Sequence, residues 1–205
     1  MTFPEFFDKA PVIRLRDPLA QLLGSATDGI MDYHYVDAVR LAGHSCPTVA
    51  GAFLTARVAL KTLYPDTLPE RGGINVLMPS AETDGTTGVV AQVLTLITGA
   101  AAQGGFKGIG PRFARNGLLS FTTQGIAHNG AIRFERLDTG ATVMVKFDAH
   151  KVPADESQRE RMQAVIQNSE TDEQQVEFAR LWQERVRRIL LEHADDPALL
   201  YIAQI

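Results

Sequence analysis

The clearest periodic pattern in the chain predicts an amphipathic helix over residues 47–64. Pro47 suits the first helical position, because its missing N–H would find no partner there. Pro65 ends the pattern. The apolar positions follow the spacing of one helix face: Val49, Phe53, Ala56, Leu60 and Leu63.

Shorter patterns predict the elements around this helix. Asp17 and Pro18 precede a short helix that contains Leu19, Leu22 and Leu23. Residues 30–35 alternate as an extended segment, and residues 36–42 form a brief helix with Asp37 as a possible N-cap and Gly43 as its stop. Strands are expected at 74–78, 118–123, 131–136 and 142–147, a hairpin turn at 138–140, and a largely apolar, buried helix at 89–102.

The composition changes after residue 153, where two polar helices are expected at 154–168 and 172–193. We therefore divide the chain into a domain at 1–152 and a helical extension at 153–205. The second helix carries an apolar stripe that must pack on the parent domain or on a second copy of the chain: Phe178, Leu181, Trp182, Val186, Ile189 and Leu190.

Composition and charge exclude several classes. The 205 residues are 45% hydrophobic and 21% charged, as in ordinary globular proteins, and the net charge of −4 comes with no basic patch for nucleic acid. A single cysteine excludes an intramolecular disulfide and fits a reducing compartment. The N-terminus lacks a signal-peptide core, and residues 89–102 are too short and too polar to span a bilayer. A cytoplasmic protein is expected.

The most informative local motif is His44-Ser45-Cys46-Pro47, immediately before the long helix. A residue before proline favours an extended conformation, in which residues i and i+2 project to the same side. His44 and Cys46 can therefore face one point, and a thiol at a helix N-terminus ionises more easily. This pair suits a soft metal ion or nucleophilic chemistry. The alternative is that Cys46 is a small buried hydrophobe and His44 an ordinary polar residue.

A second motif is the glycine-rich loop at 104–110. It lacks the glycine order of a dinucleotide-binding fingerprint and lies between a helix and a strand, the reverse of what phosphate binding needs. Lys107, Arg112 and Arg115 nevertheless offer charges to an anionic ligand, unless they form a solvated face.

The segment from Gly43 to Gly51 resembles the His-Gly-His-x-Cys-Pro-Gly signature of the FmdE-like family of formylmethanofuran dehydrogenase components. Residues 96–99, followed by the glycine-rich loop, resemble that family's helix ending in Leu-Thr-Gly and its Gly-Lys-Gly turn. The likeness covers roughly residues 30–150.

The resemblance implies an α+β fold in the order helix–strand–helix–three strands. It also implies a mixed sheet with helices on one face, to which the C-terminal helices are added. It implies a divalent metal, usually zinc, at the His-x-Cys turn, and a homodimer. The family takes its name from a component of a molybdenum or tungsten enzyme, so a redox enzyme of that type is an expected partner.

The chain departs from the family pattern at Ala42, where the first histidine of the signature would stand, and at Val89 and Gln92. Only His44 and Cys46 carry over as metal ligands. Further ligands must come from His34, Glu82, Asp84, a water or a partner chain. We favour His34 because its segment leads toward the turn, provided that the intervening helix is short. A continuous helix from 34 to 44 would hold the two rings about 15 Å apart.

Three functions follow from these observations. The first is a metal-binding domain that uses His44, Cys46 and His34. The second is a metal-free thiol enzyme with Cys46 as nucleophile and His44 as base. The third is a binding module that uses Lys107 and Arg112 for an anionic cofactor or for a redox enzyme partner.

Overall fold

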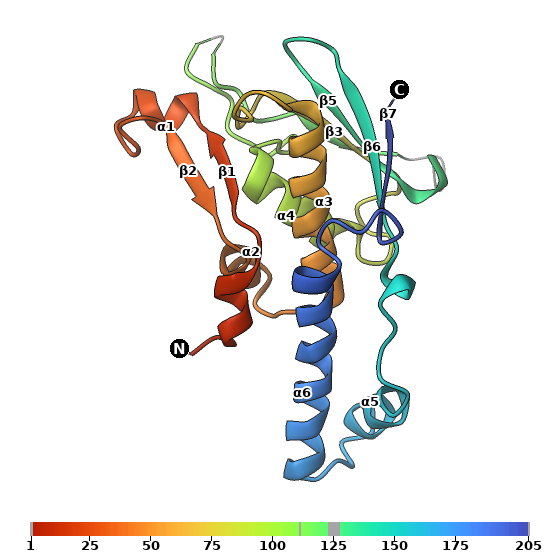
Figure 1. Ribbon diagram of the computed structural model, residues 1–205. Helices are drawn as coiled ribbons and strands as arrows, with labels where there is room; N and C mark the ends of the chain where they lie inside the picture. Colours follow the sequence, from red (N-terminus) through yellow and green to blue (C-terminus); the bar gives the residue numbers. More distant parts are fainter. Residues whose placement is uncertain (1, 111, 123–127, 205) are drawn as a thin grey trace.

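The computed structural model describes residues 2–110, 112–122 and 128–204. It has the α+β architecture that the resemblance implied, with a five-stranded mixed sheet, a separate two-stranded sheet and helices packed on one face of the larger sheet (Figure 1). The α-helices are α1 (Pro18–Leu22), α2 (Tyr35–Ala42), α3 (Pro47–Leu63), α4 (Thr87–Thr98), α5 (Gln158–Ile166) and α6 (Asp172–Arg187). The strands are β1 (Ile13–Arg16), β2 (Ile30–Tyr33), β3 (Ile74–Met78), β4 (Leu119–Phe121), β5 (Ile132–Arg136), β6 (Thr142–Phe147) and β7 (Leu200–Gln204).

The larger sheet has the strand order β4-β3-β5-β6-β7. β3 pairs parallel with β4, and all the other pairs are antiparallel. Burial alternates along the strands: Val76, Phe134 and Val145 are at most 1% exposed, whereas their sequence neighbours on the opposite face are half-buried or exposed. The predicted strands at 74–78 and 142–147 are confirmed, and 131–136 is confirmed from residue 132. The strand predicted at 118–123 is shorter, and Thr123 lies outside the described residues.

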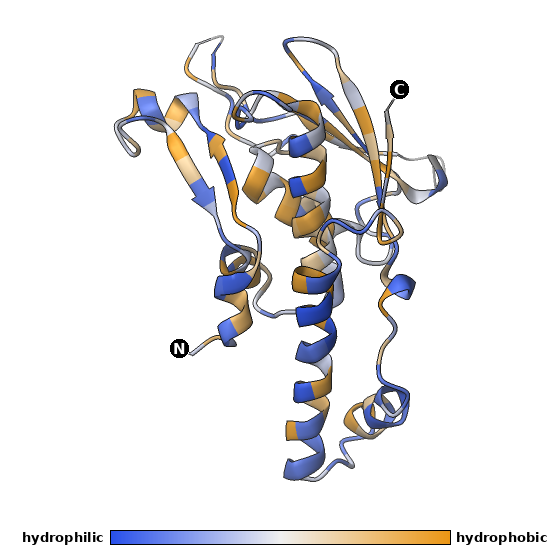
Figure 2. Ribbon diagram, in the orientation of Figure 1, coloured by the Kyte–Doolittle hydropathy of each residue, from blue (hydrophilic) through white to orange (hydrophobic). Residues whose placement is uncertain are grey.

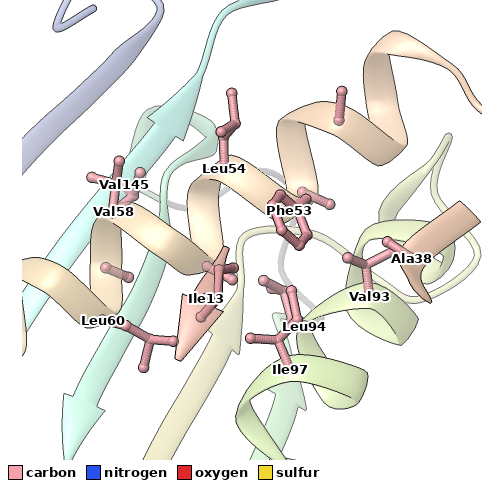
Figure 3. Close-up of a cluster of buried hydrophobic side chains, with 14 of the residues drawn as sticks. Ile13, Ala38, Phe53, Leu54, Val58, Leu60, Val93, Leu94, Ile97 and Val145 are labelled. Carbon is pink, nitrogen blue, oxygen red and sulfur yellow. The ribbon is translucent and has the colours of Figure 1, made fainter. Parts of the chain in front are cut away.

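The core is centred on α3, which is buried along nearly its whole length. Figure 3 shows Phe53 of α3 directed toward Val93 of α4, while Val58 lies beside Val145 of β6. The small residues Gly51, Ala52, Ala56 and Ala59 let this helix approach its neighbours on several sides at once. The amphipathic pattern of 47–64 therefore understated the burial of the helix.

Helix α4 shows the opposite difference. Its inner face is buried through Ala91, Leu94 and Ile97, but Gln92 is exposed and Leu96 is half-buried. The prediction that most of this helix is buried is therefore wrong. A helix in a single layer over a sheet covers only one side of itself.

The apolar stripe of α6 packs on the parent domain through its C-terminal part. Val186, Ile189 and Leu190 are fully buried, and the last two belong to a π-helical turn over Arg188–Glu192. The N-terminal half of α6 projects away from the sheet and lies beside α5 (Figures 1 and 2). The segment expected to be helical also contains β7, which completes the sheet against β6 and was not predicted.

No helix in residues 2–110, 112–122 and 128–204 has both the length and the apolar character needed to cross a membrane.

Candidate functional site

Cys46 is the N-cap of α3, as the sequence predicted. Its backbone is extended (φ −150°, ψ 167°), and Pro47 begins the helix. Its Sγ accepts a hydrogen bond from the backbone N–H of Val49 at 3.5 Å, and the side chain is 8% exposed. The sulfur therefore lies at the positive end of a 17-residue helix, where negative charge on it is stabilised.

Ser45 is held on both its side chain and its main chain. Its hydroxyl is 2.9 Å from the hydroxyl of Tyr35, whose pKa is raised by burial. Its carbonyl accepts hydrogen bonds from the indole N–H of Trp182 at 3.0 Å and from the amide of Gln183 at 3.1 Å. Helix α6 thus fixes the turn between His44 and Cys46, although Trp182 lies 137 residues away in sequence.

These two bonds give a measurable contribution to stability. The substitution Trp182→Phe removes one donor but leaves Gln183, so we expect a loss of about 1 kcal/mol in the free energy of unfolding. Adding Gln183→Leu leaves the Ser45 carbonyl without either donor and should cost a further ~1–3 kcal/mol. Urea unfolding of both variants measures this difference. A double variant no less stable than Trp182→Phe would contradict the proposed anchoring.

His44 is exposed and follows Gly43, which ends α2 in the left-handed conformation (φ 75°). Its Nδ1 lies 3.0 Å from the backbone oxygen of Ala42. A carbonyl oxygen only accepts, so Nδ1 carries the proton and the Nε2 lone pair is left available. Metal-ligating histidines are typically oriented in this way by a carbonyl on the other ring nitrogen.

His34 lies at the opposite end of α2 from His44. It is the N-cap of that helix, and its backbone N–H donates to Asp37 at 2.9 Å. Asp37 is therefore not the N-cap that the sequence predicted, but the third residue of the helix, in a capping box. Because α2 is continuous over Tyr35–Ala42, about 12 Å of helix separates its ends. The structure does not bring His34 together with the His44–Cys46 turn.

The described part of the chain contains no group of three or more His, Cys, Asp or Glu residues arranged to hold a metal ion. Glu82 and Asp84 are exposed in the turn that precedes α4. A zinc site needs three or four protein ligands. The nitrogen and sulfur donors of His44 and Cys46 fit zinc in kind, but as a pair they make only half of such a site.

Arg115 is not available to an outside anion, contrary to the sequence interpretation. It is 7% exposed, and its guanidinium lies 2.8 Å from Asp17, which also binds Arg71 at 2.9 Å. Arg71 donates in addition to the carbonyl of Leu96 near the end of α4. This buried network ties the start of α1 to the glycine-rich loop.

Burial alone would raise the pKa of the Asp17 carboxyl. Hydrogen bonds from Arg71 and from the backbone of Ala20, together with the charge of Arg115, outweigh burial and hold the pKa below its usual value. The other two cations singled out in the loop, Lys107 and Arg112, are exposed, and Arg112 lies 4.5 Å from the centre of the Phe113 ring.

The chain is similar to one solved structure, that of a tungsten formylmethanofuran dehydrogenase FmdE-like protein from Syntrophus aciditrophicus. The two are 17% identical, with a TM-score of 0.44, over 84% of this chain and 72% of that one. No family model and no curated protein matches the sequence. The solved structure carries the name of the family that residues 43–51 resemble, but a similarity of this size concerns the course of the chain alone.

Proposed function

We propose that the chain is a divalent-metal-binding protein that holds zinc, or a similar transition metal, at the His44–Cys46 turn. The observation that carries the proposal is the hydrogen bond from His44 Nδ1 to Ala42, which leaves Nε2 unprotonated only two residues before a sulfur at a helix N-terminus. Nitrogen and sulfur together are a preferred donor set for zinc. An open coordination position would make bound water more acidic.

The remaining ligands come from outside the turn. Because α2 separates His34 from His44, we propose that a second copy of the chain or bound water completes the coordination. A site shared between two copies would make the protein a homodimer whose assembly depends on metal. Association with a molybdenum or tungsten redox enzyme remains a prediction, which a pull-down with the intact chain would test.

The first test is the metal content of the purified protein, measured by mass spectrometry. We expect roughly one zinc per chain, or about half that value for a shared site, and loss of nearly all of it in the double variant His44→Ala, Cys46→Ala. His34→Ala is the matched control, since it removes an exposed histidine from the other end of α2. Zinc content unchanged in the double variant would refute the proposal, and so would loss in the control alone.

A metal-free thiol enzyme is the second candidate. It is favoured by the bond from Val49 N–H to Cys46 Sγ, which stabilises a thiolate. Rapid alkylation of Cys46 near neutral pH that chelators do not change would support this alternative over the metal site.

A further inference from the structure

A cleft of about 600 Å³ opens between the N-terminal turns of α3, the start of α4 and the end of the sheet where β6 leaves it. Neither His44 nor Cys46 lines it. Its volume is in the range of pockets that hold small organic molecules. No role assigned above uses this cleft.

The residues of α3 that line the cleft lie on one face of the helix. Gly51 and Ala52 lie between Thr48 and Thr55 at the i, i+3, i+4, i+7 spacing. Glycine and alanine leave room where larger side chains would fill the space. The apolar wall opposite comes from Met78, Ile132 and Val145, which are at most 8% exposed.

The polar groups of the cleft are hydrogen-bond donors near the start of α4. Thr86 is the N-cap of this helix, but its side chain makes no capping hydrogen bond. The first turn of a helix has N–H groups without intrahelical partners, and they favour a negatively charged acceptor. Thr86 and Thr87 both line the cleft, so this end of α4 opens into it.

Thr55 gives a second, independent indication of a polar ligand. It is 2% exposed and lines the cleft from the third turn of α3. The hydroxyls of Thr62 and Thr98 donate to the carbonyl four residues earlier. Within the described residues no such bond is found for Thr55. A buried hydroxyl without a protein partner costs free energy that a ligand would recover.

Three groups with ionisable side chains stand at the rim. Lys146 and His150 are exposed, and Asp148 accepts a hydrogen bond from the backbone of His150 at 3.1 Å. The negative charge of Asp148 is thus partly satisfied within the chain, while Lys146 adds a positive charge at the mouth. Anionic ligands are favoured over cationic ones.

We propose that this cleft binds a small organic carboxylate with an apolar body. Its carboxylate would accept from the first turn of α4 and its body would lie against Met78 and Val145. A compact monocarboxylate suits the site because the rim offers only one lysine, whereas a polyanion would need more. The inference does not depend on the metal site, since the two share no residue.

The test uses 2-naphthoate and its neutral counterpart 2-naphthylmethanol as probes, with binding measured by calorimetry on the full-length protein. We expect the carboxylate to bind at least about tenfold more tightly than the alcohol. Thr86→Asp places a like charge at the start of α4 and should weaken naphthoate binding by about tenfold or more, while the neutral Thr86→Asn should change it less than about threefold.

Thr139→Asp is the matched control, because it adds the same charge in the exposed turn between β5 and β6 and should leave binding unchanged. The circular dichroism spectrum and melting temperature of each variant show that it is folded. Equal affinity for the two probes, or equal weakening by the aspartate and asparagine variants, would overturn the proposal. Retention of naphthoate binding in the His44→Ala, Cys46→Ala variant would separate this site from the metal site, and its loss would contradict their independence.

Discussion

Replacing Asp17 with asparagine is expected to lower the free energy of unfolding by about 3–5 kcal/mol. Asp17 is 3% exposed and is the shared counter-ion of Arg71 and Arg115. Asparagine keeps an oxygen that can cap α1 but removes the charge, so Arg115 would stay buried without a partner. Removing one member of a buried ion pair is costly for this reason. Urea unfolding measures the change.

Asp32→Asn is the matched control. Asp32 forms a two-bond ion pair with Arg14, but the Arg14 side chain is 62% exposed. Exposed pairs contribute about 0–1 kcal/mol. Similar losses in the two variants would mean that burial of the Asp17 network has no special weight in the stability of the fold.

The same network predicts a dependence of stability on acid. The pKa of Asp17 is lower in the folded protein than in the unfolded chain, where it is about 3.9. The unfolded state therefore binds more protons in this range, and the contribution of Asp17 to stability is lost as the pH falls below about 4. Asp17→Asn should unfold with a flatter acid dependence. An acid profile parallel to that of the original protein would contradict this assignment.

Gly51→Ala is expected to destabilise the protein by about 1–3 kcal/mol, although alanine favours helices. A methyl group at this position would overlap the ring of Phe147 at the end of β6. In the background of Phe147→Ala the same change has room and should become neutral or stabilising by up to about 1 kcal/mol. A double-mutant cycle measures the reversal of sign. Equal effects in both backgrounds would show that the helix and β6 are not in close contact here.

Elements with local causes were predictable from the sequence. Pro47, the apolar spacing of 47–64 and the left-handed Gly43 determine where α3 begins and where α2 ends. β1 and β7 were missed because four- and five-residue strands are defined by their partners, β2 and β6, rather than by their own pattern. The N-cap of α2 was placed three residues late because Asp37 can cap a helix from either position of a capping box.

The candidate sites divide in the same way. The extended Cys46 at the start of α3 follows from the proline after it, and the sequence predicted this geometry. The pairing of Arg115 with Asp17, 98 residues apart, could not be predicted from spacing. Nor could the cleft, which combines residues of α3, α4 and β6. The orientation of His44 depends on a carbonyl that only the end of α2 places within reach.

Cobalt titration tests the metal site most directly, because cobalt(II) accepts the ligands of zinc and reports on them by absorbance. We predict that the protein gives a thiolate-to-cobalt charge-transfer band, and that Cys46→Ser abolishes the band while the fold is retained. A protein that binds cobalt without this band, or one whose band survives in Cys46→Ser, would show that Cys46 is not a ligand.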